Sequence, residues 1–486
     1  MAIVDRTSAD AVRLSFKEWH RRSDSLAAQI ADRGVGPGDV VAILMPSSSD
    51  FAVAYGAIGL AGGVVTAINP RLGRREIAAI LHRADPALVL LDREAFADCP
   101  VTAPAVIDRS ALRTDGPPLG ERRPRLTEAD PAVIVWTSGT TGTPKGAWFD
   151  HRNLRAAVES AGPMAHPYDV RLVVAPFAHA GYMAKPWEQI AWGVCLVIAP
   201  TPWSPAEMLR LMVDERVTIA GGAPTQWLKL LEQPGLADAD LSCLRLGGVA
   251  MAPASPELVE RVTRATGAPL IVRYSMTESP SVSSTQPDDP PDVQYRTVGR
   301  AVTGMELKVV DDHGRHARVD TVGRIRVRGE CVMRGYWRDP ELTAAAFDDD
   351  GWLATSDLGR IDADGNLRLA GRASEMYIRG GYNVYPIEVE NVLAEHPKVA
   401  RAAVVGTPAP VIGEIGVAFV IAAEPSEPPT LAELRAWVAA DLADYKAPDR
   451  LVVVDELPLT AMLKIDKATL AHLAAETTDD RHRSIG

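Results

Sequence analysis

Apolar runs and amphipathic stretches alternate along the chain up to about residue 297. Runs rich in valine, isoleucine and leucine occur at residues 40–44, near 64, and at 87–91, 133–136, 173–175, 194–198 and 217–220. Between them, apolar residues recur at helical spacing in residues 19–31, from residue 49, in residues 74–83 and from residue 151. Strands that alternate with helices in this way predict a parallel α/β sheet covered by helices.

The pattern changes after about residue 297. Short alternating runs at residues 306–310 and 324–328 lie between glycine turns and predict an antiparallel β subdomain. Residues beyond 372 predict a small α+β unit, with helices at 386–394 and 431–442, strands near 404 and 417, and a polar tail. We therefore expect an α/β protein with a large N-terminal domain over residues 1–372, made of parallel α/β subdomains plus the β subdomain. A small mobile C-terminal domain over residues 373–486 would follow it.

Composition narrows the function classes. Lysine and arginine total 51 against 63 acidic residues, a net charge of −12, which argues against a general nucleic-acid binder. Four scattered cysteines form no CxxC pair, so neither a zinc site nor a disulfide framework is predicted. An uncharged stretch at residues 51–70 contains four glycines, and we interpret it as a buried helix and a strand rather than a membrane span. The first residues lack the order of a signal peptide, and we expect a cytoplasmic protein.

Candidate chemistry begins directly after the apolar run at residues 133–136. Residues 137–146 supply three glycines, five hydroxyls and one lysine. Glycines let backbone amides approach a ligand, hydroxyls donate to oxyanions, and lysine adds a positive charge, so the stretch is suited to a polyphosphate. It is not a Walker loop, because Gly142 and Lys145 are not adjacent. From composition alone, a flexible surface loop is the alternative.

The loop and a series of later motifs resemble the AMP-forming acid ligases, a superfamily that includes acyl-CoA synthetases, peptide-synthetase adenylation domains and firefly luciferase. The motifs occur in the family's order at residues 136–146, 274–278, 356–359, 371–372, 380–383 and 457–466. The resemblance covers nearly the whole chain. It implies that a carboxylate attacks the α-phosphate of ATP to form an acyl-adenylate, and that a thiol or amine then displaces AMP.

The resemblance also implies roles for individual residues. Phosphate binding falls to Thr137, Ser138, Gly139, Thr140, Thr141, Gly142 and Lys145. Thr277 would donate to the α-phosphate and Glu278 would bind Mg²⁺, unless Glu278 is only a surface carboxylate. Adenine and ribose would be bound by Gly247, Gly248, Val249, Tyr274, Ser275, Asp357 and Arg372. The structural alternatives are a plain turn at Gly247 and Gly248, a turn residue at Asp357, and a linker ion pair at Arg372.

Lys464 is the strongest catalytic candidate. In the family, this lysine comes from the small domain and bridges the attacking carboxylate and the ribosyl oxygen. Two positions depart from the family pattern: Leu463 replaces the usual glycine before the lysine, and Ser374 replaces the usual charged hinge residue. Gly380 and Gly381 fit the family's thioester-forming face and favour CoA as the acceptor.

The acid is expected in an apolar pocket of moderate size. By position, its lining would include Phe177, Gly181, Tyr182, Gly222 and Met276, with His179 at the place of the family's gate residue. A satisfied core histidine is the alternative for His179. We expect a medium-sized aromatic, alicyclic or fatty monocarboxylic acid.

Three functions are compared on this basis. The first is an ATP-, Mg²⁺- and CoA-dependent acyl-CoA ligase. The second is a ligase of the same fold that transfers the acyl group to an amine or a carrier-protein thiol. The third, a non-catalytic nucleotide-binding protein, is disfavoured because all five motif residues are intact: Lys145, Glu278, Asp357, Arg372 and Lys464. A small-molecule acid and CoA are the expected partners, and a homodimer is left open.

Overall fold

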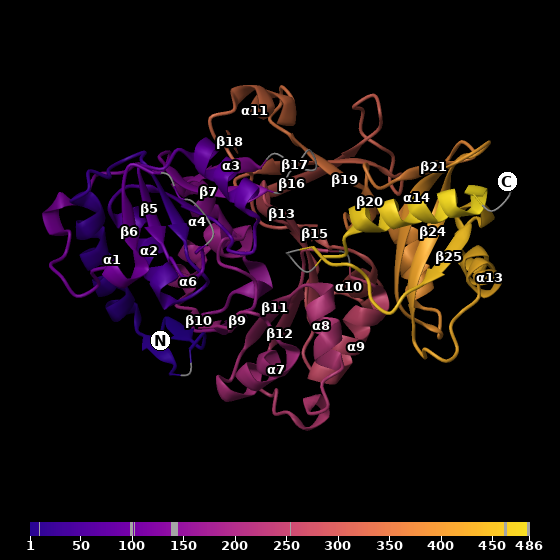
Figure 1. Cartoon of the computed structure of the whole chain (residues 1–486), viewed down its shortest axis with the longest axis horizontal. Helices are drawn as coiled ribbons and strands as arrows, with labels where there is room; N and C mark the ends of the chain where they lie inside the picture. Colours follow the sequence, from indigo (N-terminus) through magenta and orange to yellow (C-terminus); the bar gives the residue numbers. More distant parts are fainter. Residues whose placement is uncertain are drawn as a thin grey trace.

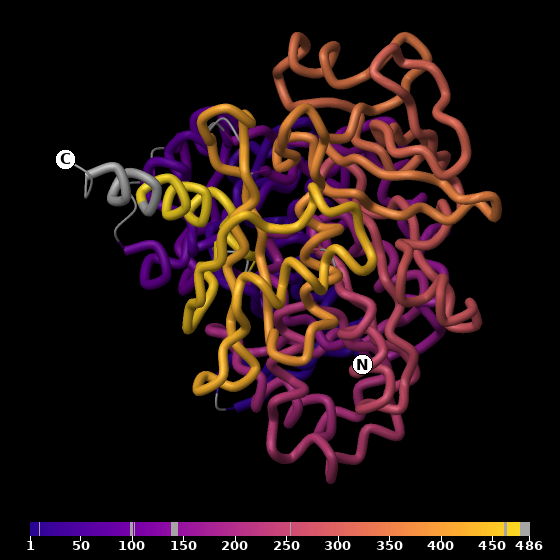
Figure 2. Tube along the Cα trace, turned by 90° about the vertical axis from the view of Figure 1, so that its right-hand side faces the viewer, coloured from indigo at the N-terminus to yellow at the C-terminus, as the bar shows by residue number. Residues whose placement is uncertain are grey.

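The computed structural model describes residues 1–8, 10–97, 101, 103–137, 144–252, 254–460 and 464–483, with side chains up to residue 476. Figure 1 shows a large N-terminal body and, beside it, a smaller body formed by the end of the chain. In the perpendicular view of Figure 2, the C-terminal segment lies in front of the large body. The predicted bodies of the α/β fold are therefore present, whereas the boundary at residue 372 remains a prediction.

The first sheet has seven strands. Its order is β18 (Gly335–Tyr336), β8 (Lys145–Asp150), β7 (Pro131–Thr137), β4 (Val64–Ala67), β3 (Val40–Leu44), β5 (Leu88–Leu91) and β6 (Val106–Asp108). Strands β7, β4, β3, β5 and β6 are parallel, and β8 and β18 add antiparallel pairs at one edge. Helices α1 (Phe16–Ala31) and α2 (Ser49–Leu60) pack on one face and α3 (Arg74–Ala84) on the other. Because strand side chains alternate between faces, Val41 and Ile43 join the core on the first side, and Ala42 and Leu44 join the core on the second.

The second sheet has nine strands. Its order is β15 (Arg300–Ala301), β14 (Ser279–Ser284), β13 (Leu270–Met276), β12 (Leu246–Val249), β11 (Ile219–Gly222), β9 (Val170–Val173), β10 (Cys195–Ile198), β1 (Ile3–Asp5) and β2 (Val12–Leu14). Its middle is parallel, and both ends are antiparallel. The accompanying helices are α4 (His151–Glu159), α5 (Ala180–Met183), α6 (Pro186–Trp192), α7 (Pro205–Asp214), α8 (Pro224–Leu231), α9 (Pro256–Thr266) and α10 (Pro291–Arg296).

Two smaller sheets complete the molecule. The first is antiparallel and contains β16 (Met305–Val310), β17 (Gly323–Gly329), β19 (Leu353–Ile361) and β20 (Leu367–Arg372), with α11 (Pro340–Ala346) nearby in sequence. The C-terminal sheet contains β22 (Tyr382–Val384), β21 (Tyr377–Arg379), β24 (Gly413–Ala422), β23 (Val399–Ala409) and β25 (Arg450–Val453). Helices α12 (Pro386–Ala394) and α13 (Leu431–Asp441) cover one face of it and α14 (Lys467–Arg483) the other. Its two cores contain residues from Tyr377 onward, which supports a separate C-terminal unit.

Most of the predicted elements are confirmed, and the differences have local causes. The helix predicted in residues 19–31 is confirmed as α1, which begins three residues earlier because the Ser15 hydroxyl accepts a hydrogen bond from the Glu18 amide at 3.1 Å. The prediction of a polar tail was wrong. Residues 467–483 form helix α14, whose Leu470 and Ala474 are buried against the C-terminal sheet. Between residues 97 and 130, where no strand is predicted from the sequence, residues 106–108 form strand β6. Among the described residues, no helix combines the length and apolar character needed to cross a bilayer.

Candidate active site

An antiparallel hairpin carries two of the residues predicted to bind the nucleotide, and we call this part of the molecule the nucleotide end of the candidate site. Strands β19 and β20 pair so that Asp357 lies opposite Arg372, and the Arg372 Nε atom is 3.4 Å from Asp357 Oδ1. The Tyr274 hydroxyl, from β13, donates to Asp357 Oδ2 at 2.5 Å. Asp357 lies within a strand, so the turn-residue alternative is wrong, and the ion pair of Arg372 with Asp357 leaves the structural alternative for Arg372 in place. The carboxylate is held by a phenol and a guanidinium, which leaves acceptor capacity for hydroxyl groups of a ligand.

A second hairpin carries Thr137 and Lys145, which are predicted to bind phosphate, and we call it the phosphate end of the candidate site. Thr137 at the end of β7 pairs with Lys145 at the start of β8, and the predicted Ser138, Gly139, Thr140, Thr141 and Gly142 lie outside the described residues. The Lys145 Nζ atom is 5.7 Å from the centre of the Tyr336 ring. The Tyr336 hydroxyl donates to Glu278 Oε1 at 3.0 Å, so this ring connects the phosphate-loop lysine with the candidate metal ligand.

Tyr336 contacts two of the predicted site residues and was not itself predicted from the sequence. It lies on β18, a strand of only two residues, which is too short to produce a periodic signal. Its strand pairs with β8, where Tyr336 faces Ala147, two residues after Lys145. Burial and the Glu278 carboxylate both raise the pKa of Tyr336, so its hydroxyl stays protonated and acts as a donor.

Thr277 and Glu278 occupy the turn of the β13–β14 hairpin, directly after the strand that carries Tyr274, Ser275 and Met276. The Glu278 backbone carbonyl accepts a hydrogen bond from the Met333 amide at 2.8 Å, which fixes the turn. Both side chains are partly exposed. The Glu278 carboxylate accepts a hydrogen bond from the Tyr336 hydroxyl, and the Lys145 amine lies over the ring of the same tyrosine. One carboxylate beside a phosphate site suits Mg²⁺, which is commonly bound by one or two carboxylates and by phosphate oxygens.

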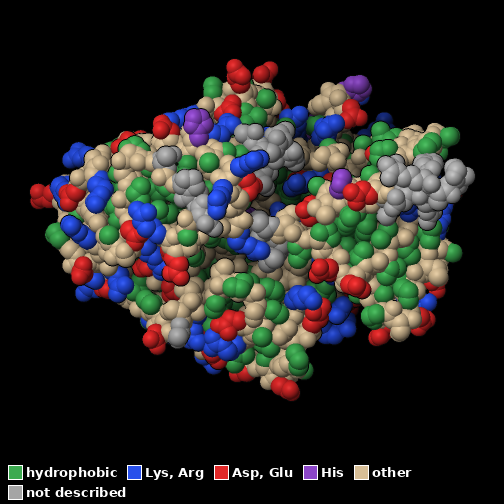
Figure 3. All heavy atoms as spheres, viewed as in Figure 1, with side chains coloured by type: hydrophobic (Ala, Val, Ile, Leu, Met, Phe, Trp, Pro, Cys, Tyr) green, Lys and Arg blue, Asp and Glu red, His purple; other side chains and the backbone are tan. Residues whose placement is uncertain are grey.

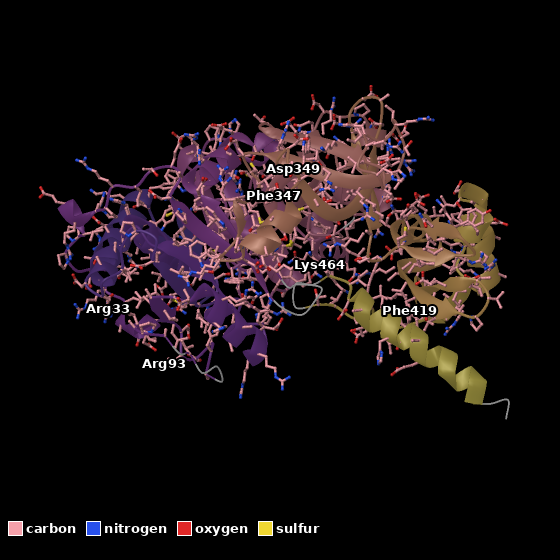
Figure 4. The ribbon with its side chains drawn as sticks, turned by 90° about the horizontal axis from the view of Figure 1, so that it is seen from above. Arg33, Arg93, Phe347, Asp349, Phe419 and Lys464 are labelled. Carbon is pink, nitrogen blue, oxygen red and sulfur yellow. The ribbon has the colours of Figure 1, made fainter. Side chains whose placement is uncertain are left out.

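Lys464 reaches the nucleotide end from the C-terminal body. Figure 4 shows it at the junction of the two bodies, between the large domain and the sheet that contains Phe419. Burial lowers the pKa of Lys464, Arg372 lowers it further, and Asp357 acts in the opposite direction. The structure therefore brings together Lys464, Asp357 and Arg372, as the sequence predicted, although Leu463 lies outside the described residues.

His179 lies on the same side as Lys464. It caps the N-terminus of α5, where its Nδ1 atom accepts a hydrogen bond from the Gly181 amide at 3.2 Å. Burial lowers the pKa of His179 to about 4, and the nearby charge of Lys464 contributes, so the imidazole is neutral at pH 7. A neutral ring whose Nδ1 atom accepts this bond carries its proton on Nε2 and can donate from there.

The predicted acid-pocket residues occupy different environments. Phe177 and Tyr182 stack at a ring separation of 3.7 Å and pack against Phe51, so they form a rigid buried wall. Gly181 is exposed beside His179, and Met276 is partly exposed at the end of β13. Gly222 is buried at the end of β11, against Gln226.

A surface hollow lies next to these residues. Val173, Val174, Ala175 and Pro176, just before Phe177, form part of its lining. The other lining residues are Ser47, Arg71, Ala199, Thr201, Trp203, Gln226 and Met251. They come from the carboxyl ends of parallel strands in both sheets, which is where open α/β sheets usually bind ligands. Gln226, Trp203 and Arg71 were not predicted, because their positions become adjacent only in the folded sheets.

The remaining glycine candidates differ in their surroundings. Gly247, Gly248 and Val249 form the buried strand β12, so the plain-turn alternative is wrong. A Cβ at Gly247 would lie 2.8 Å from Leu270 Cδ1, which explains the glycine by close packing. Gly380 and Gly381 form the exposed turn between β21 and β22 with φ angles of 58° and 89°, a region that glycine adopts readily.

Charge on this face of the molecule is mixed. Figure 3 shows acidic and basic side chains interspersed over both bodies. Within the described site, Lys145, Arg372 and Lys464 supply cations, and Glu278 and Asp357 supply carboxylates. This donor set fits a nucleotide: the cations suit phosphates, Asp357 suits ribose hydroxyls, and Glu278 suits a cation bound to phosphate.

Comparisons with known proteins agree with this geometry. The family model described as AMP-binding enzyme matches residues 1–337, and the model for the AMP-binding enzyme C-terminal domain matches residues 388–464. The 3-[(3aS,4S,7aS)-7a-methyl-1,5-dioxo-octahydro-1H-inden-4-yl]propanoyl:CoA ligase of Rhodococcus jostii (strain RHA1) is 34% identical, over 94% of this chain and 93% of its own length.

Two solved structures are similar over nearly the full length. ATP-bound MatB from Rhodopseudomonas palustris has a TM-score of 0.88 at 29% identity and covers 97% of this chain and 95% of its own. The amide bond synthetase McbA from Marinactinospora thermotolerans has a TM-score of 0.87 at 30% identity, with coverages of 97% and 96%. The chain belongs to the AMP-binding enzyme family and is an AMP-forming ligase of the acyl-CoA synthetase superfamily.

Proposed function

We propose that the chain converts a medium-sized monocarboxylic acid into its CoA thioester through an acyl-adenylate. The observation that carries this proposal is the position of Lys464 at the junction of the two bodies, where its charge interacts with those of Asp357 and Arg372. A cation at this point can neutralise charge where two anions, the carboxylate and the α-phosphate, must approach each other.

The first half-reaction forms one bond and breaks one. A carboxylate oxygen of the acid bonds to the α-phosphorus of ATP, and pyrophosphate leaves with the bonding electrons. Lys464 would stabilise the negative charge on the reacting oxygens, and Thr277 would donate to the α-phosphate. Lys145 and the Thr137 hydroxyl would hold the phosphates that leave.

Metal binding at Glu278 is part of the proposal. The Glu278 carboxylate, aligned by the Tyr336 hydroxyl at 3.0 Å, would hold Mg²⁺ together with phosphate oxygens. When bound, the ion would offset the negative charge of the phosphates. Among the described residues, no group of three or more His, Cys, Asp or Glu side chains could hold a metal ion.

In the second half-reaction, the CoA thiolate attacks the acyl carbon and AMP leaves. Gly380 and Gly381 form an exposed turn without side chains, and we propose that the pantetheine arm passes this turn after the C-terminal body has rotated. The hinge is proposed at Ser374, which is exposed and lies two residues after Arg372.

The acid is proposed to be alicyclic or aromatic. Support comes from the relative named for a ring-fused propanoyl substrate. His179, neutral at pH 7, would donate from Nε2 to an oxygen of the acid at the pocket entrance. A cytoplasmic location is also proposed, since Cys195, Cys243 and Cys331 are free thiols.

Acceptor choice decides between the two enzyme functions. We expect acid-dependent pyrophosphate release with ring-containing acids, followed by thioester formation when CoA is added. An amide formed with amines, and no thioester with CoA, would replace the proposal with an amide ligase like McbA.

Lys464→Ala should lower pyrophosphate release at least about 100-fold while sparing thioester formation from supplied acyl-adenylate. Equal loss of both half-reactions would contradict the role of Lys464.

A further inference from the structure

Lys467 lies between two carboxylates at the base of the segment that carries Lys464. Its Nζ atom is 3.0 Å from Glu375 Oε2 and 2.9 Å from Glu390 Oε1. The side chains are largely buried, with 21% of Lys467, 32% of Glu375 and 17% of Glu390 exposed. Burial disfavours the charged form of Lys467, but the attraction of Glu390 and Glu375 is stronger than this effect. The pKa of Lys467 is therefore raised above its ordinary value. Lys467 is therefore a fixed cation at neutral pH.

Two described stretches ahead of Lys467, residues 458–460 and 464–466, are joined by hydrogen bonds, and we call these two paired stretches the arch. The Thr460 amide donates to the Lys464 carbonyl at 2.7 Å, and the Lys464 amide donates to the Thr460 hydroxyl at 3.3 Å. Leu459 pairs with Ile465, and the Asp466 amide donates to the Pro458 carbonyl at 2.8 Å. Because the two sides of the arch are joined, a shift at its base moves the Lys464 backbone with it.

The two glutamates connect this base to fixed parts of the fold. The Glu375 amide donates to the Arg372 carbonyl at 3.0 Å, so Glu375 belongs to the turn that follows Arg372 and contains Ser374. Glu390, on α12, also accepts a hydrogen bond from the Val404 amide of β23 at 2.7 Å. Lys467 thus joins the arch to the hinge turn on one side and to the C-terminal sheet on the other.

We propose that Lys467 is a positioning residue for adenylation, which acts by holding the arch so that the Lys464 amine lies opposite Arg372 and Asp357. The inference rests on the proposed adenylation reaction and extends it to a residue that touches neither nucleotide nor acid. Misplacement of a catalytic group by about 1 Å can cost on the order of 100-fold in rate, so a small shift of the arch matters. An ion pair with two partners is suited to this task, because losing the cation leaves two carboxylates unpaired.

The main test compares Lys467→Met with a matched control. Lys398 lies in the same body, bridges Glu427 at 3.2 Å and Glu433 at 3.0 Å, and is remote from the arch in sequence. Lys467→Met should lower the kcat of acid-dependent pyrophosphate release about 10- to 100-fold and leave thioester formation from supplied acyl-adenylate within about threefold. Lys398→Met should leave both near wild type, and Lys467→Arg should recover most of the adenylation rate.

A double variant separates positioning from general damage. If Lys467 acts through Lys464, adding Lys467→Met to Lys464→Ala should cause no further loss of adenylation, because residues that act as a unit are not additive. A multiplied loss, or equal loss of both half-reactions, would overturn the proposal. If Lys467→Met folds poorly, the triple variant with Glu375→Gln and Glu390→Gln removes the unpaired carboxylates. It should regain thermal stability and remain slow in adenylation.

Hydrogen exchange gives a readout that does not depend on activity. Amides of residues 456–470 should exchange faster in Lys467→Met than in wild type and in Lys398→Met. Unchanged exchange there would refute the inference even if no acid is ever found to react. Failure of wild-type protein to release pyrophosphate with any acid, combined with faster exchange in the variant, would refute only the proposed function.

Discussion

At the scale of single residues, Lys185 stands out as a cation in unfavourable surroundings. Burial lowers the pKa of Lys185 to about 7, Arg273 lowers it further, and Glu188 opposes both. Glu188 is already engaged by Arg171, whose Nη2 atom is 2.5 Å from Glu188 Oε1. Three cations therefore share one carboxylate in the interior beside α5 and α6, an arrangement that costs stability.

Lys185→Met should therefore stabilise the protein, and the gain should depend on pH. The folded-state pKa of about 7 is below the ordinary 10.5, so between these values the unfolded chain binds a proton that the folded chain does not. The contribution of Lys185 to the free energy of unfolding is therefore lowest below about pH 7. Between pH 7 and the ordinary pKa of lysine, this contribution rises by about 1.4 kcal/mol per pH unit. The advantage of Lys185→Met should accordingly be largest at pH 7 and shrink toward pH 10.

Denaturant unfolding of both proteins from pH 6 to 10 measures this difference. The exposed Lys17 provides the control, since Lys17→Met should change stability little at any pH. A loss of stability in Lys185→Met at pH 7 would show that Lys185 is stabilised by its surroundings. An advantage that stays constant with pH would show that the pKa of Lys185 is the same in the folded and unfolded chains.

At the scale of elements, strand pairing creates contacts that no local pattern shows. The two-residue strand β18 adds to the edge of β8 and brings Tyr336 between Lys145 and Glu278. Tyr336→Phe keeps the ring beside Lys145 and removes only the hydrogen bond to Glu278. We expect an apparent Mg²⁺ affinity at least about 10-fold weaker, because losing one hydrogen bond to a charged group costs about 1.5 kcal/mol or more.

Mg²⁺ titration of the adenylation rate at saturating ATP tests this. The Mg²⁺ requirement should rise in Tyr336→Phe, and excess Mg²⁺ should recover most of the rate. A rate that excess Mg²⁺ does not recover would mean that Tyr336 acts on the phosphates and not through Glu278. Tyr295→Phe, on α10, serves as a control for loss of a tyrosine hydroxyl elsewhere.

Elements and motifs were predictable from the sequence to different degrees. Runs such as residues 40–44 and 133–136 became β3 and β7, because buried parallel strands are apolar throughout. Asp357, Arg372 and Lys464 were predicted through motifs, and the structure brings them together. Tyr336, Gln226 and Lys467 were not predicted, since their roles depend on strand register and on contacts between distant segments. The helix over residues 467–483 was missed because its burial depends on the sheet beneath it.

At the scale of the whole molecule, charged contacts join the two bodies. Arg296 at the end of α10 is 3.7 Å from Glu395, which follows α12. Burial lowers the pKa of Arg401 on β23, and the charge of Glu232, at the end of α8, opposes that effect. Arg401 is therefore a C-terminal cation close to an acidic group of the large body. Together with Lys464, these contacts favour the arrangement in which adenylation is proposed to occur.

Reversing one of these charges should shift the balance between the two half-reactions. Arg401→Glu places a second carboxylate near Glu232, and like charges in contact disfavour the arrangement seen here. Adenylation should slow about 10-fold, and thioester formation from supplied acyl-adenylate should hold or increase, because the C-terminal body leaves this position more readily. The defect should shrink at high salt, which screens partly exposed charges.

The charge-swapped variant Glu232→Arg/Arg401→Glu provides the decisive comparison. It restores opposite charges across the boundary, so its adenylation rate should return to within about threefold of wild type. Glu232→Arg alone should slow adenylation as Arg401→Glu does, since it places two cations together. If both single variants are slow and the swap is equally slow, Arg401 acts through packing within its own sheet. If the swap restores adenylation but slows thioester formation, the same charges also hold the C-terminal body after rotation. The contact is then not specific to the first half-reaction.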